Sequence, residues 1–337
     1  MVKRVGNLMA RIADRENLNE AFLRAAKAKR GRQAVTDFRR NLDENLQEMQ
    51  RKLLDGSFRF GQYHFFTVHD PKTRSICAAS FPERVAFHAI MRICHPVFDA
   101  YQPFDSYACR KGKGQYKALE RAQYFARRYR WFAKLDVRHY FDSISHTILI
   151  RQLCRLFKDR QLLLHFSDLI ASYRATEGRG IPIGNLTSQY FANHYLAAAD
   201  HYAREQIGVG AMVRYMDDIL LFAREKDELI GLLGQYSRYL HDSLRLEIHE
   251  PVVNRTVHGI PFLGYVVYDF GLRLNRRSKK RYYKKMQMLS TAVNLGEISE
   301  DCYAGHAQCL TAFVLKANTQ GFREKVLNTR GMYLQGL

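Results

Sequence analysis

Apolar side chains recur along the chain at helical spacing over much of its length. Within residues 37–54, Leu42, Leu46, Met49 and Leu53 are spaced by four, three and four residues, and Gly56 then ends the helix. The same kind of pattern predicts further helices within 82–98, 107–123, 146–173 (two helices), 186–207, 226–244, 272–301 and 302–317. Helices therefore form most of the predicted structure.

Strands are predicted in three places by alternating or short apolar runs, and a further strand-like segment follows residue 244 and runs to Arg255. Residues 58–81 alternate and contain the turn signal Asp70-Pro71, which predicts a hairpin. Residues 131–137 predict a strand with Phe132, Lys134 and Asp136 on one face. Residues 211–222 are two short apolar runs around Asp217 and Asp218, which predicts a second hairpin with both carboxylates at or beside its turn.

The order of these elements predicts the α+β class, with an antiparallel sheet packed on helices. No internal repeat, low-complexity segment or Pro- or Ser-rich linker marks a domain boundary. Residues 1–35 are polar and basic, and two interpretations stay open for them: a helical arm or a loosely ordered extension. The basic, helical residues after Leu272 predict a separate helical lobe at the C-terminal end.

The charge of the chain predicts a polyanionic partner. Lys and Arg number 53 against 33 Asp and Glu, giving a formal charge of +20 and a pI near 9.8. The cations are spread along the chain and mixed with 20 Tyr and 21 Phe, which favours nucleic acid over an anionic membrane. Charge alone does not distinguish this from a generic basic surface.

The remaining composition predicts a protein of the cytoplasm with no membrane partner. The six cysteines include no C-x-x-C pair and no His at zinc spacing, so we expect reduced thiols. No apolar run follows the N-terminus as in a signal peptide, and none reaches the length needed to span a bilayer.

Asp217 and Asp218 are unfavourable neighbours on an apolar hairpin unless a cation or water compensates for their charge. A solvated turn is the simpler interpretation, since Asp is common in turns. Asp136, at the end of another strand, supplies the further carboxylate that a metal site needs. Carboxylates on neighbouring strands can hold two Mg²⁺ ions about 3.5–4 Å apart, the arrangement used in nucleotidyl transfer. The main-chain carbonyl of Val137 would complete this set.

Three segments, in the right order, resemble the motifs of reverse transcriptases. Residues 132–141 (FAKLDVRHYF) resemble motif A, residues 180–189 (GIPIGNLTSQ) motif B, and residues 215–218 (YMDD) motif C. The resemblance runs from about residue 36 to the C-terminus. It implies a right-hand polymerase fold with fingers at 36–130 and parts of 145–185, a palm at 131–265 and a helical thumb at 266–337, after the basic extension 1–35.

Motif B resembles more narrowly that of the reverse transcriptases of diversity-generating retroelements, because Ile183 stands in place of a common Gln and Gln189 in place of a Pro. The resemblance implies error-prone copying of a template-repeat RNA at adenines, with an oligomeric accessory variability determinant protein, in a bacterial, archaeal or phage-infected host cell. An aliphatic Ile183 cannot supply the hydrogen bonds of a Gln, which offers a physical reason for errors. It does not explain why adenine is affected.

The resemblance also implies roles for individual residues. Asp136, Asp217 and Asp218 are the expected catalytic residues, and with the Val137 carbonyl they form the expected site for two Mg²⁺ ions, with Mn²⁺ as a substitute. Residues expected to bind the dNTP are Lys72, Arg74, Arg110, Phe141 (as a steric gate against the 2′-hydroxyl), Ile183 and Gln189. Residues expected to bind the template RNA and the primer or cDNA are Gly264 and Tyr265 in the primer grip and Arg276, Arg277, Lys279 and Lys280 in the thumb.

Some alternatives stay open at this point. The segment that resembles motif D lacks the usual Lys, so its general acid is unassigned between His249 and Arg255. No RNase H domain is expected after the thumb. A retron or group II intron-like reverse transcriptase is the nearest alternative, and a non-catalytic RNA-binding protein on a polymerase fold is the alternative of another class.

Overall fold

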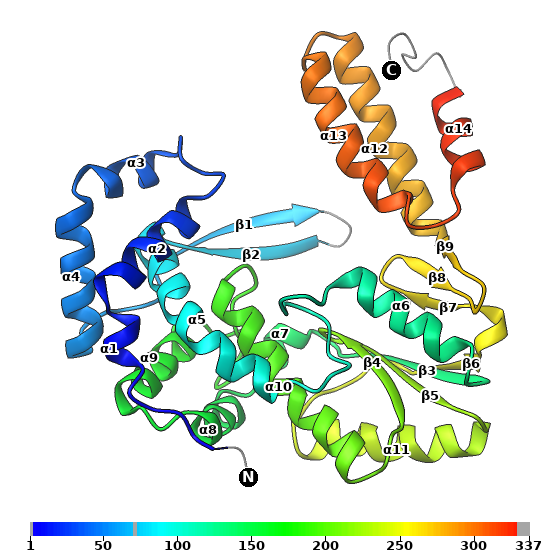
Figure 1. Ribbon diagram of the computed structural model, residues 1–337, viewed down its shortest axis with the longest axis horizontal. Coiled ribbons are helices and arrows are strands. Elements are labelled where there is room, and N and C mark those ends of the chain that lie inside the picture. The colour runs from blue at the N-terminus through cyan, green and yellow to red at the C-terminus, as the bar shows by residue number, and fades with distance from the viewer. Residues whose placement is uncertain (1–2, 70–72, 329–337) are drawn as a thin grey trace.

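The computed structural model describes residues 3–69 and 73–328. Its elements form three groups, with the N-terminal helices and one hairpin on one side, an antiparallel sheet and helices below, and three C-terminal helices standing apart (Figure 1). In the described residues, no helix is both long and apolar enough to cross a membrane. The mixture of helices and antiparallel sheets confirms the predicted α+β class.

The N-terminal segment is an integral part of the first group and not a separate extension. Leu18, Ala21, Phe22 and Ala25 are buried, at spacings of three, one and three residues that mark one helical face. The Asn17 side-chain amide donates to the Ala89 carbonyl at 3.1 Å. This hydrogen bond joins the helix Arg15–Ala26 to the helix Phe81–Tyr101. Within residues 3–35, the structure contains helices at 9–12 and 15–26 that pack against the rest of the chain, which agrees with the helical interpretation of this segment.

The helix predicted at 37–54 is interrupted at one residue in the structure. Asn41 has φ −119° and ψ 47°, outside the helical region, and so separates two helices. Leu46, Met49 and Leu53 are buried as predicted, and Gly56 ends the second helix. The helices of the first group are α1 (Met9–Ile12), α2 (Arg15–Ala26), α3 (Gln33–Arg40), α4 (Leu42–Asp55) and α5 (Phe81–Tyr101).

The predicted hairpin at 58–81 is present as β1 (Tyr63–His69) and β2 (Thr73–Ala79). Its strands are antiparallel, with Phe66 opposite Ile76 and Val68 opposite Arg74. The hairpin projects into the space between the first group and the C-terminal helices (Figure 1). Its predicted turn, Asp70-Pro71, and the adjacent Lys72 lie outside the described residues.

The central sheet has four antiparallel strands in the order β4-β5-β3-β6. β3 (Trp131–Asp136) lies between β5 (Asp218–Ala223) and β6 (Val252–Arg255), and β4 (Ala211–Tyr215) forms the edge beyond β5. Segments more than 80 residues apart in the chain thus become neighbours in one sheet.

The two faces of this sheet are covered by different elements, as the alternation in β3 predicted. Ala133 and Leu135 belong to the larger core, with α8 (His146–Leu156), α9 (Arg160–Ala171), α10 (Leu186–Glu205) and α11 (Lys226–Asp242). Phe132 belongs to a second core on the other face, with α6 (Gln115–Ala126). Lys134 and Asp136 share the face of Phe132, so the carboxylate at the strand end lies on that face.

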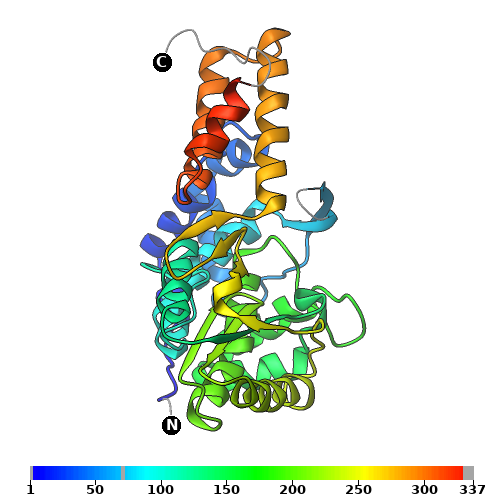
Figure 2. The same ribbon diagram turned by 90° about the vertical axis from the view of Figure 1, so that its right-hand side faces the viewer.

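A three-stranded sheet connects the palm to the C-terminal helices (Figure 2). Its strands are β7 (Ile260–Phe262), β8 (Tyr265–Val267) and β9 (Leu272–Leu274), after the short 3₁₀ helix η1 (Thr256–His258). The C-terminal helices are α12 (Arg276–Asn294), α13 (Glu300–Val314) and α14 (Gln320–Asn328). They form the helical lobe predicted after Leu272, except that β9 precedes it. One further short helix, α7 (Tyr140–Ser143), follows β3.

His194 of α10 makes the fold sensitive to acid. Its ring is buried between Phe98 and Tyr101, at centroid distances of 5.5 and 4.9 Å, and burial lowers its pKa to about 4. An unfolded chain binds this proton near pH 6.5, so the stabilisation is present above pH 6.5 and is lost as the pH falls towards 4. We expect a loss of about 2 kcal/mol in the free energy of unfolding between pH 7 and 5 from this residue.

Replacing His194 with Phe should remove that loss while keeping an aromatic ring at the site. Urea unfolding of both proteins at pH 7 and pH 5 measures it. Equal pH dependence in the two proteins would contradict the assignment to His194.

Candidate active site

The hairpin of β4 and β5 places Asp217 in a two-residue turn. Tyr215 pairs with Asp218, so Met216 and Asp217 are the turn residues. Met216 has φ 57°, a conformation that L-residues rarely adopt and that two-residue hairpin turns require at their first position. The turn therefore lifts Asp217 off the end of the sheet at the expense of local backbone strain.

Register brings the predicted carboxylates together. Asp136 is the direct cross-strand partner of Asp218, because β3 and β5 pair antiparallel from Trp131–Ala223 to this position. Lys134, on the same face two residues earlier, places its Nζ 3.0 Å from Asp218 Oδ1. All three aspartates lie together at this end of the sheet, and one of the three already has a cationic partner.

The electrostatics of Asp217 reflect this crowding. Burial raises the pKa of its carboxyl to about 6, and the charges of Asp136 and Asp218 act in the same direction. A main-chain hydrogen bond at Asp217 and the cation of Arg74 act against the rise. Arg74 of β2 is thus close enough to Asp217 to influence its carboxylate electrostatically.

Arg214 supports the turn from inside the protein, a role that the sequence did not predict. Its side chain is fully buried, pairs with Asp200 at 2.6 Å and donates to the Met216 carbonyl at 3.2 Å. It also donates to Asn193 Oδ1 at 2.8 Å and to Gln102 Oε1 at 3.2 Å. Burial by itself lowers the pKa of Arg214, but the Asp200 carboxylate raises it above its ordinary value. In the sequence, the only indication of this buried network is that a charged residue, Arg214, stands inside the first apolar run of 211–222.

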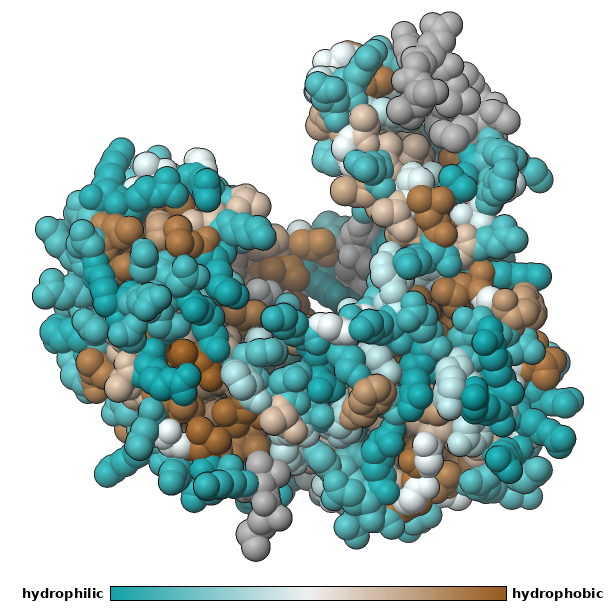
Figure 3. Space-filling model, in the orientation of Figure 1, coloured by the Kyte–Doolittle hydropathy of each residue, from teal (hydrophilic) through white to brown (hydrophobic). Residues whose placement is uncertain are grey.

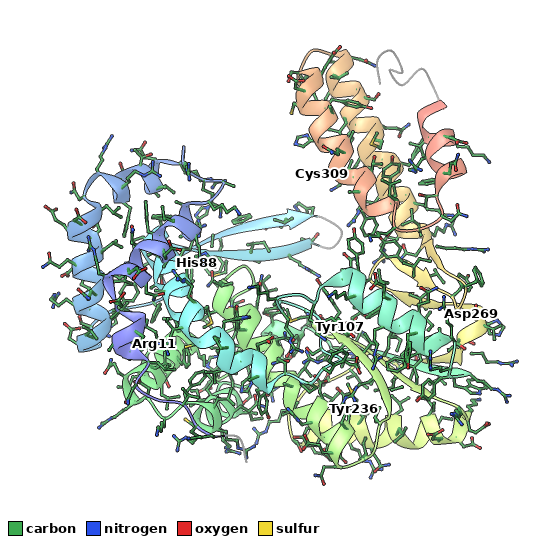
Figure 4. All side chains as sticks on the ribbon, in the orientation of Figure 1. Arg11, His88, Tyr107, Tyr236, Asp269 and Cys309 are labelled. Carbon is green, nitrogen blue, oxygen red and sulfur yellow. The ribbon has the colours of Figure 1, made fainter. Side chains whose placement is uncertain are left out.

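Neighbouring segments enclose the Arg214 network. The Tyr107 amide donates to the Arg214 carbonyl at 2.9 Å, and the loop that contains Tyr107 runs beside the edge strand β4. Tyr236 of α11 approaches from the opposite side of the sheet, and both tyrosines are labelled in Figure 4. The turn that contains Asp217 therefore rests on buried side chains from several segments.

The structure gives Arg110 a role that the sequence did not predict. Its Nε donates to Asp99 Oδ1 at 2.7 Å, and its Nη1 donates to the carbonyls of Pro103 and Ser106 at 2.6 and 3.0 Å. The guanidinium fastens the loop before α6 to the end of α5. These contacts hold the guanidinium of Arg110 inside the protein, and its predicted contact with the triphosphate stays a prediction.

The motif B loop is attached to the hairpin β1–β2. The Cys77 amide of β2 donates to the Ile183 carbonyl at 2.8 Å. Gly184 has φ 116°, and a Cβ there would lie 2.9 Å from Ile76 Cγ2 and 3.0 Å from the Cys77 carbonyl oxygen, so only glycine permits this approach. Gln189, on the first turns of α10, is exposed and accepts a hydrogen bond from Cys109 Sγ at 3.4 Å.

Phe141 lies in α7, just after the catalytic strand. Its side chain is half-buried against the larger core and contacts the ring of Tyr140 at 5.8 Å between centroids. The Phe141 carbonyl accepts from the Ile181 amide at 2.9 Å, which joins motif A to the motif B loop. A half-buried ring in this place suits both a steric gate and a packing residue.

In the predicted primer grip, the Tyr265 side chain packs inside the protein. Tyr265 is fully buried, and its hydroxyl donates to the Phe313 carbonyl at 2.5 Å, while its predicted contact with nucleic acid stays a prediction. Gly264 is in the turn between β7 and β8, where a Cβ would lie 3.0 Å from both Phe313 Cζ and Ser278 Oγ. The predicted thumb cations are all exposed on the first turns of α12: Arg276, Arg277, Lys279 and Lys280.

The two candidates for the general acid differ in position. The His249 amide donates to the Asp136 carbonyl at 2.9 Å, which places His249 beside the catalytic strand. Arg255 is opposite Trp131, at the other end of β3. Position therefore favours His249.

A basic cavity adjoins the same end of β3. It has a volume of about 670 Å³ and is lined by Arg138, His139, Ser143, Arg179, His241, Asp242, Arg245 and Glu247. The Arg138 amide donates to the Glu247 carbonyl at 2.8 Å, so the cavity begins two residues beyond Asp136.

The donor set at the turn fits a hard divalent cation. Carboxylate oxygens are the ligands that Mg²⁺ prefers, and mutual repulsion of the three aspartates is relieved by a positive ion. The Asp136 carbonyl is already an acceptor for His249, whereas the Val137 carbonyl accepts no main-chain hydrogen bond among the described residues. Within residues 3–69 and 73–328, no three His, Cys, Asp or Glu side chains are already arranged as a metal-binding group.

Known proteins resemble this chain over the region that holds the site. The family described as reverse transcriptase (RNA-dependent DNA polymerase) matches residues 69–267. The putative COX1/OXI3 intron 1 protein of Saccharomyces cerevisiae is 23% identical over 173 residues, which cover 49% of this chain and 21% of that protein. Protein YkfC of Escherichia coli K12 is 21% identical over 324 residues, which cover 82% of this chain and 81% of that protein. The chain thus spans only a fifth of the yeast relative's length.

A solved structure with the same fold is that of apo telomerase from Candida tropicalis. It superposes with a TM-score of 0.51 at 10% identity and covers 85% of this chain and 63% of that chain. This likeness supports the right-hand arrangement of fingers, palm and thumb. Because the family match includes more than half of the residues and all three motifs, the chain belongs to the reverse transcriptase (RNA-dependent DNA polymerase) family.

Proposed function

We propose that the protein is an RNA-directed DNA polymerase that extends a primer on an RNA template. The observation that carries this proposal is the meeting of Asp136, Asp217 and Asp218 at one end of the palm sheet, with the pKa of Asp217 raised to about 6. Paired carboxylates of this kind suit metal-assisted nucleotidyl transfer. The excess of basic residues, +20 overall, suits a nucleic-acid substrate.

Asp136 and Asp217 would hold two Mg²⁺ ions, with the Val137 carbonyl as a further donor and Mn²⁺ as a substitute. Such ions, when bound, activate the attacking 3′-hydroxyl and stabilise the leaving pyrophosphate. Lys134 forms an ion pair with Asp218 and so reduces the negative charge that the ions would have to neutralise. Arg74, whose charge acts on Asp217, and Lys72 are the proposed cationic contacts of the triphosphate. The arginines of the basic cavity provide further positive charge beside Asp136.

We expect Phe141→Ala to admit ribonucleotides, because the ring would no longer block the space beneath the sugar. The measurement is the ratio of kcat/KM for dNTP and rNTP with a single template base. We expect this ratio to fall by about ten-fold or more, while dNTP incorporation changes less. Phe157→Leu, in the core and away from the site, is the matched control. An unchanged ratio in Phe141→Ala would leave the ring as a packing residue.

We further propose that the enzyme makes adenine-mutagenic cDNA from a template-repeat RNA in a diversity-generating retroelement. Ile183 and Gln189 in motif B support this proposal. The attachment of Ile183 to Cys77 also supports it, because an aliphatic side chain is then held beside the fingers, where a nascent base pair would pass. The proposed partners are dNTPs, template RNA, cDNA and an oligomeric accessory variability determinant protein, in the cytoplasm of the host cell.

We expect Ile183→Gln to lower misincorporation opposite adenine, since the amide restores hydrogen bonds to the nascent pair. The measurement is sequencing of cDNA made on an RNA template that contains all four bases. Errors opposite adenine should fall several-fold relative to errors opposite the other bases. Ile183→Leu keeps an aliphatic side chain and should retain the parental error spectrum. The same spectrum in Gln and Leu variants would refute this explanation of motif B.

The match to an intron protein of yeast favours a second candidate, a group II intron-like or retron reverse transcriptase. The parental error spectrum separates the two. Errors concentrated at adenine support the retroelement proposal, and an even, low error rate supports the alternative. Absence of any incorporation on RNA with Mg²⁺ or Mn²⁺ would favour a non-catalytic RNA-binding protein.

A further inference from the structure

The outer face of α6 carries basic and aromatic side chains in a regular order. Lys117, Arg121 and Tyr124 are spaced by four and three residues, so they share one side of the helix, and Arg128 follows just beyond its C-terminal end. The opposite side is buried in the second core. Tyr124 is 41% exposed, with the guanidinium carbons of Arg128 and Arg121 at 3.6 and 4.9 Å from its ring centroid. This face of α6 therefore presents an aromatic ring together with two cations.

The pattern continues beyond the N-terminal end of α6. Phe104, in the preceding loop, is 66% exposed. Lys113 Nζ lies 3.5 Å from its ring centroid, and the Arg121 guanidinium carbon lies 5.6 Å from it. Arg121 therefore bridges Phe104 and Tyr124, and it is itself held by Asp105 at 2.8 Å.

The pattern continues at the other end as well. Arg127 Nε donates to the Asp269 carbonyl at 2.7 Å, which fastens the loop between β8 and β9 to α6; Asp269 is labelled in Figure 4. Phe270 in this loop is 68% exposed and stacks on Tyr268 at 5.0 Å between centroids and 17° between planes. The guanidinium carbon of Arg273 lies 5.5 Å from the Phe270 ring. We call Phe104, Arg121, Tyr124, Arg128 and Phe270 the α6 strip.

The α6 strip is separate from the catalytic groove. α6 lies in the outermost layer of the palm, in front of the sheet in Figure 1 and at the left edge in Figure 2. The hollow between the thumb and the β1–β2 hairpin lies above α6 in Figure 3. The twelve residues of α6 span about 18 Å, and the flanking loops lengthen the strip. This length accommodates several nucleotides of an extended strand.

The chemistry of the strip matches single-stranded RNA. Exposed rings stack on unpaired bases, and cations between them neutralise the phosphates. A duplex presents no unstacked bases, and an acidic polypeptide would use the cations without needing the rings. Glu120 is an exposed acid on α6, but the basic residues outnumber it. We propose that the α6 strip binds a single-stranded segment of RNA outside the catalytic groove, which, if the proposed function holds, is the unpaired part of the template RNA.

The test measures RNA binding with the groove already filled. Full-length protein is saturated with an unlabelled hairpin primer–template, and a fluorescent, unstructured RNA of about ten nucleotides is then titrated by anisotropy. We expect the labelled RNA to bind as a second ligand, and Tyr124→Ala with Phe270→Ala to weaken it about ten-fold or more. Arg128→Ala should reduce the slope of log K against log salt by about 0.7.

The double variant Arg224→Ala with Arg238→Ala is the matched control, because both residues are exposed on the other side of the sheet. Arg224 lies just before α11, and Arg238 lies within it. This control should keep the affinity for the labelled RNA within about two-fold, and the ring variant should still extend a primer on a short template. Displacement of the labelled RNA by the hairpin, or equal affinity in the ring and control variants, would overturn the proposal. A different result is that the parental protein incorporates no nucleotide but still binds the labelled RNA through the two rings. That result would refute the proposed polymerase function, while the proposal that the α6 strip binds RNA would stand.

Discussion

Asp217→Asn will abolish incorporation of dNTPs on an RNA template, with a loss of at least about a thousand-fold in kcat. The amide keeps the shape of the side chain but removes the charge through which the turn would bind a metal ion. Because the carboxylates of Asp136 and Asp218 repel that of Asp217, the substitution also removes an unfavourable interaction. The variant should therefore fold as well as the parent.

The measurement is single-nucleotide primer extension at saturating Mg²⁺, repeated with Mn²⁺. Thermal unfolding and RNA affinity of the same preparation show whether the loss is confined to chemistry. Asp227→Asn, on the exposed first turn of α11, is the matched control and should retain parental activity. If Asp217→Asn kept more than a tenth of parental kcat, the assignment of the metal site to this turn would be wrong.

Asp200→Ala will destabilise the protein and slow catalysis, although Asp200 lies outside the catalytic groove. The substitution leaves the guanidinium of Arg214 charged and fully buried without its carboxylate. Removing one partner of a buried pair costs about 3–5 kcal/mol. Since Arg214 donates to the Met216 carbonyl in the strained turn, the position of Asp217 should also be disturbed. A displacement of about 1 Å at a catalytic group can reduce kcat about a hundred-fold.

Asp200→Asn and Asp105→Asn separate these two effects. The asparagine at position 200 keeps a hydrogen-bond acceptor for Arg214 and should lose less stability and less kcat than the alanine. Asp105 pairs with Arg121 at 2.8 Å and is also buried, but it does not contact the turn, so its variant should lose stability with kcat largely unchanged. Equal losses of kcat in the Asp105 and Asp200 variants at matched stability would indicate that Arg214 has no special role in positioning the turn.

Periodicity was a sound guide to the elements because burial on one face imposes it. The strand ending at Asp136 and the hairpin around Asp217 were both predicted, since each alternates or runs apolar against a core. The break at Asn41 was not predicted, because the apolar spacing continues across it. The helices of residues 9–26 carried the same signal in Leu18 and Phe22, but their high charge obscured it.

Side-chain roles were harder to predict than elements. Arg110 and Tyr265 stand at positions where the family places binding residues, yet Arg110 is held by Asp99 and Tyr265 is buried against the thumb. Whether a basic or aromatic side chain faces a substrate or a neighbouring segment depends on which groups lie nearby in space. The sequence contains no direct record of these neighbours.

The sequence by itself determined the central strand and hairpin, most of the helices, the family and the carboxylates that carry the proposed chemistry, because spacing and residue type are local properties of the chain. Only the tertiary structure decided that Asp136 faces Asp218 in register, that Arg214 and Asp200 support the turn from behind, and that rings and cations line the outside of α6. These features arise from contacts between segments distant in the chain. Such contacts depend on strand pairing and core packing, which fix geometry that no local pattern specifies.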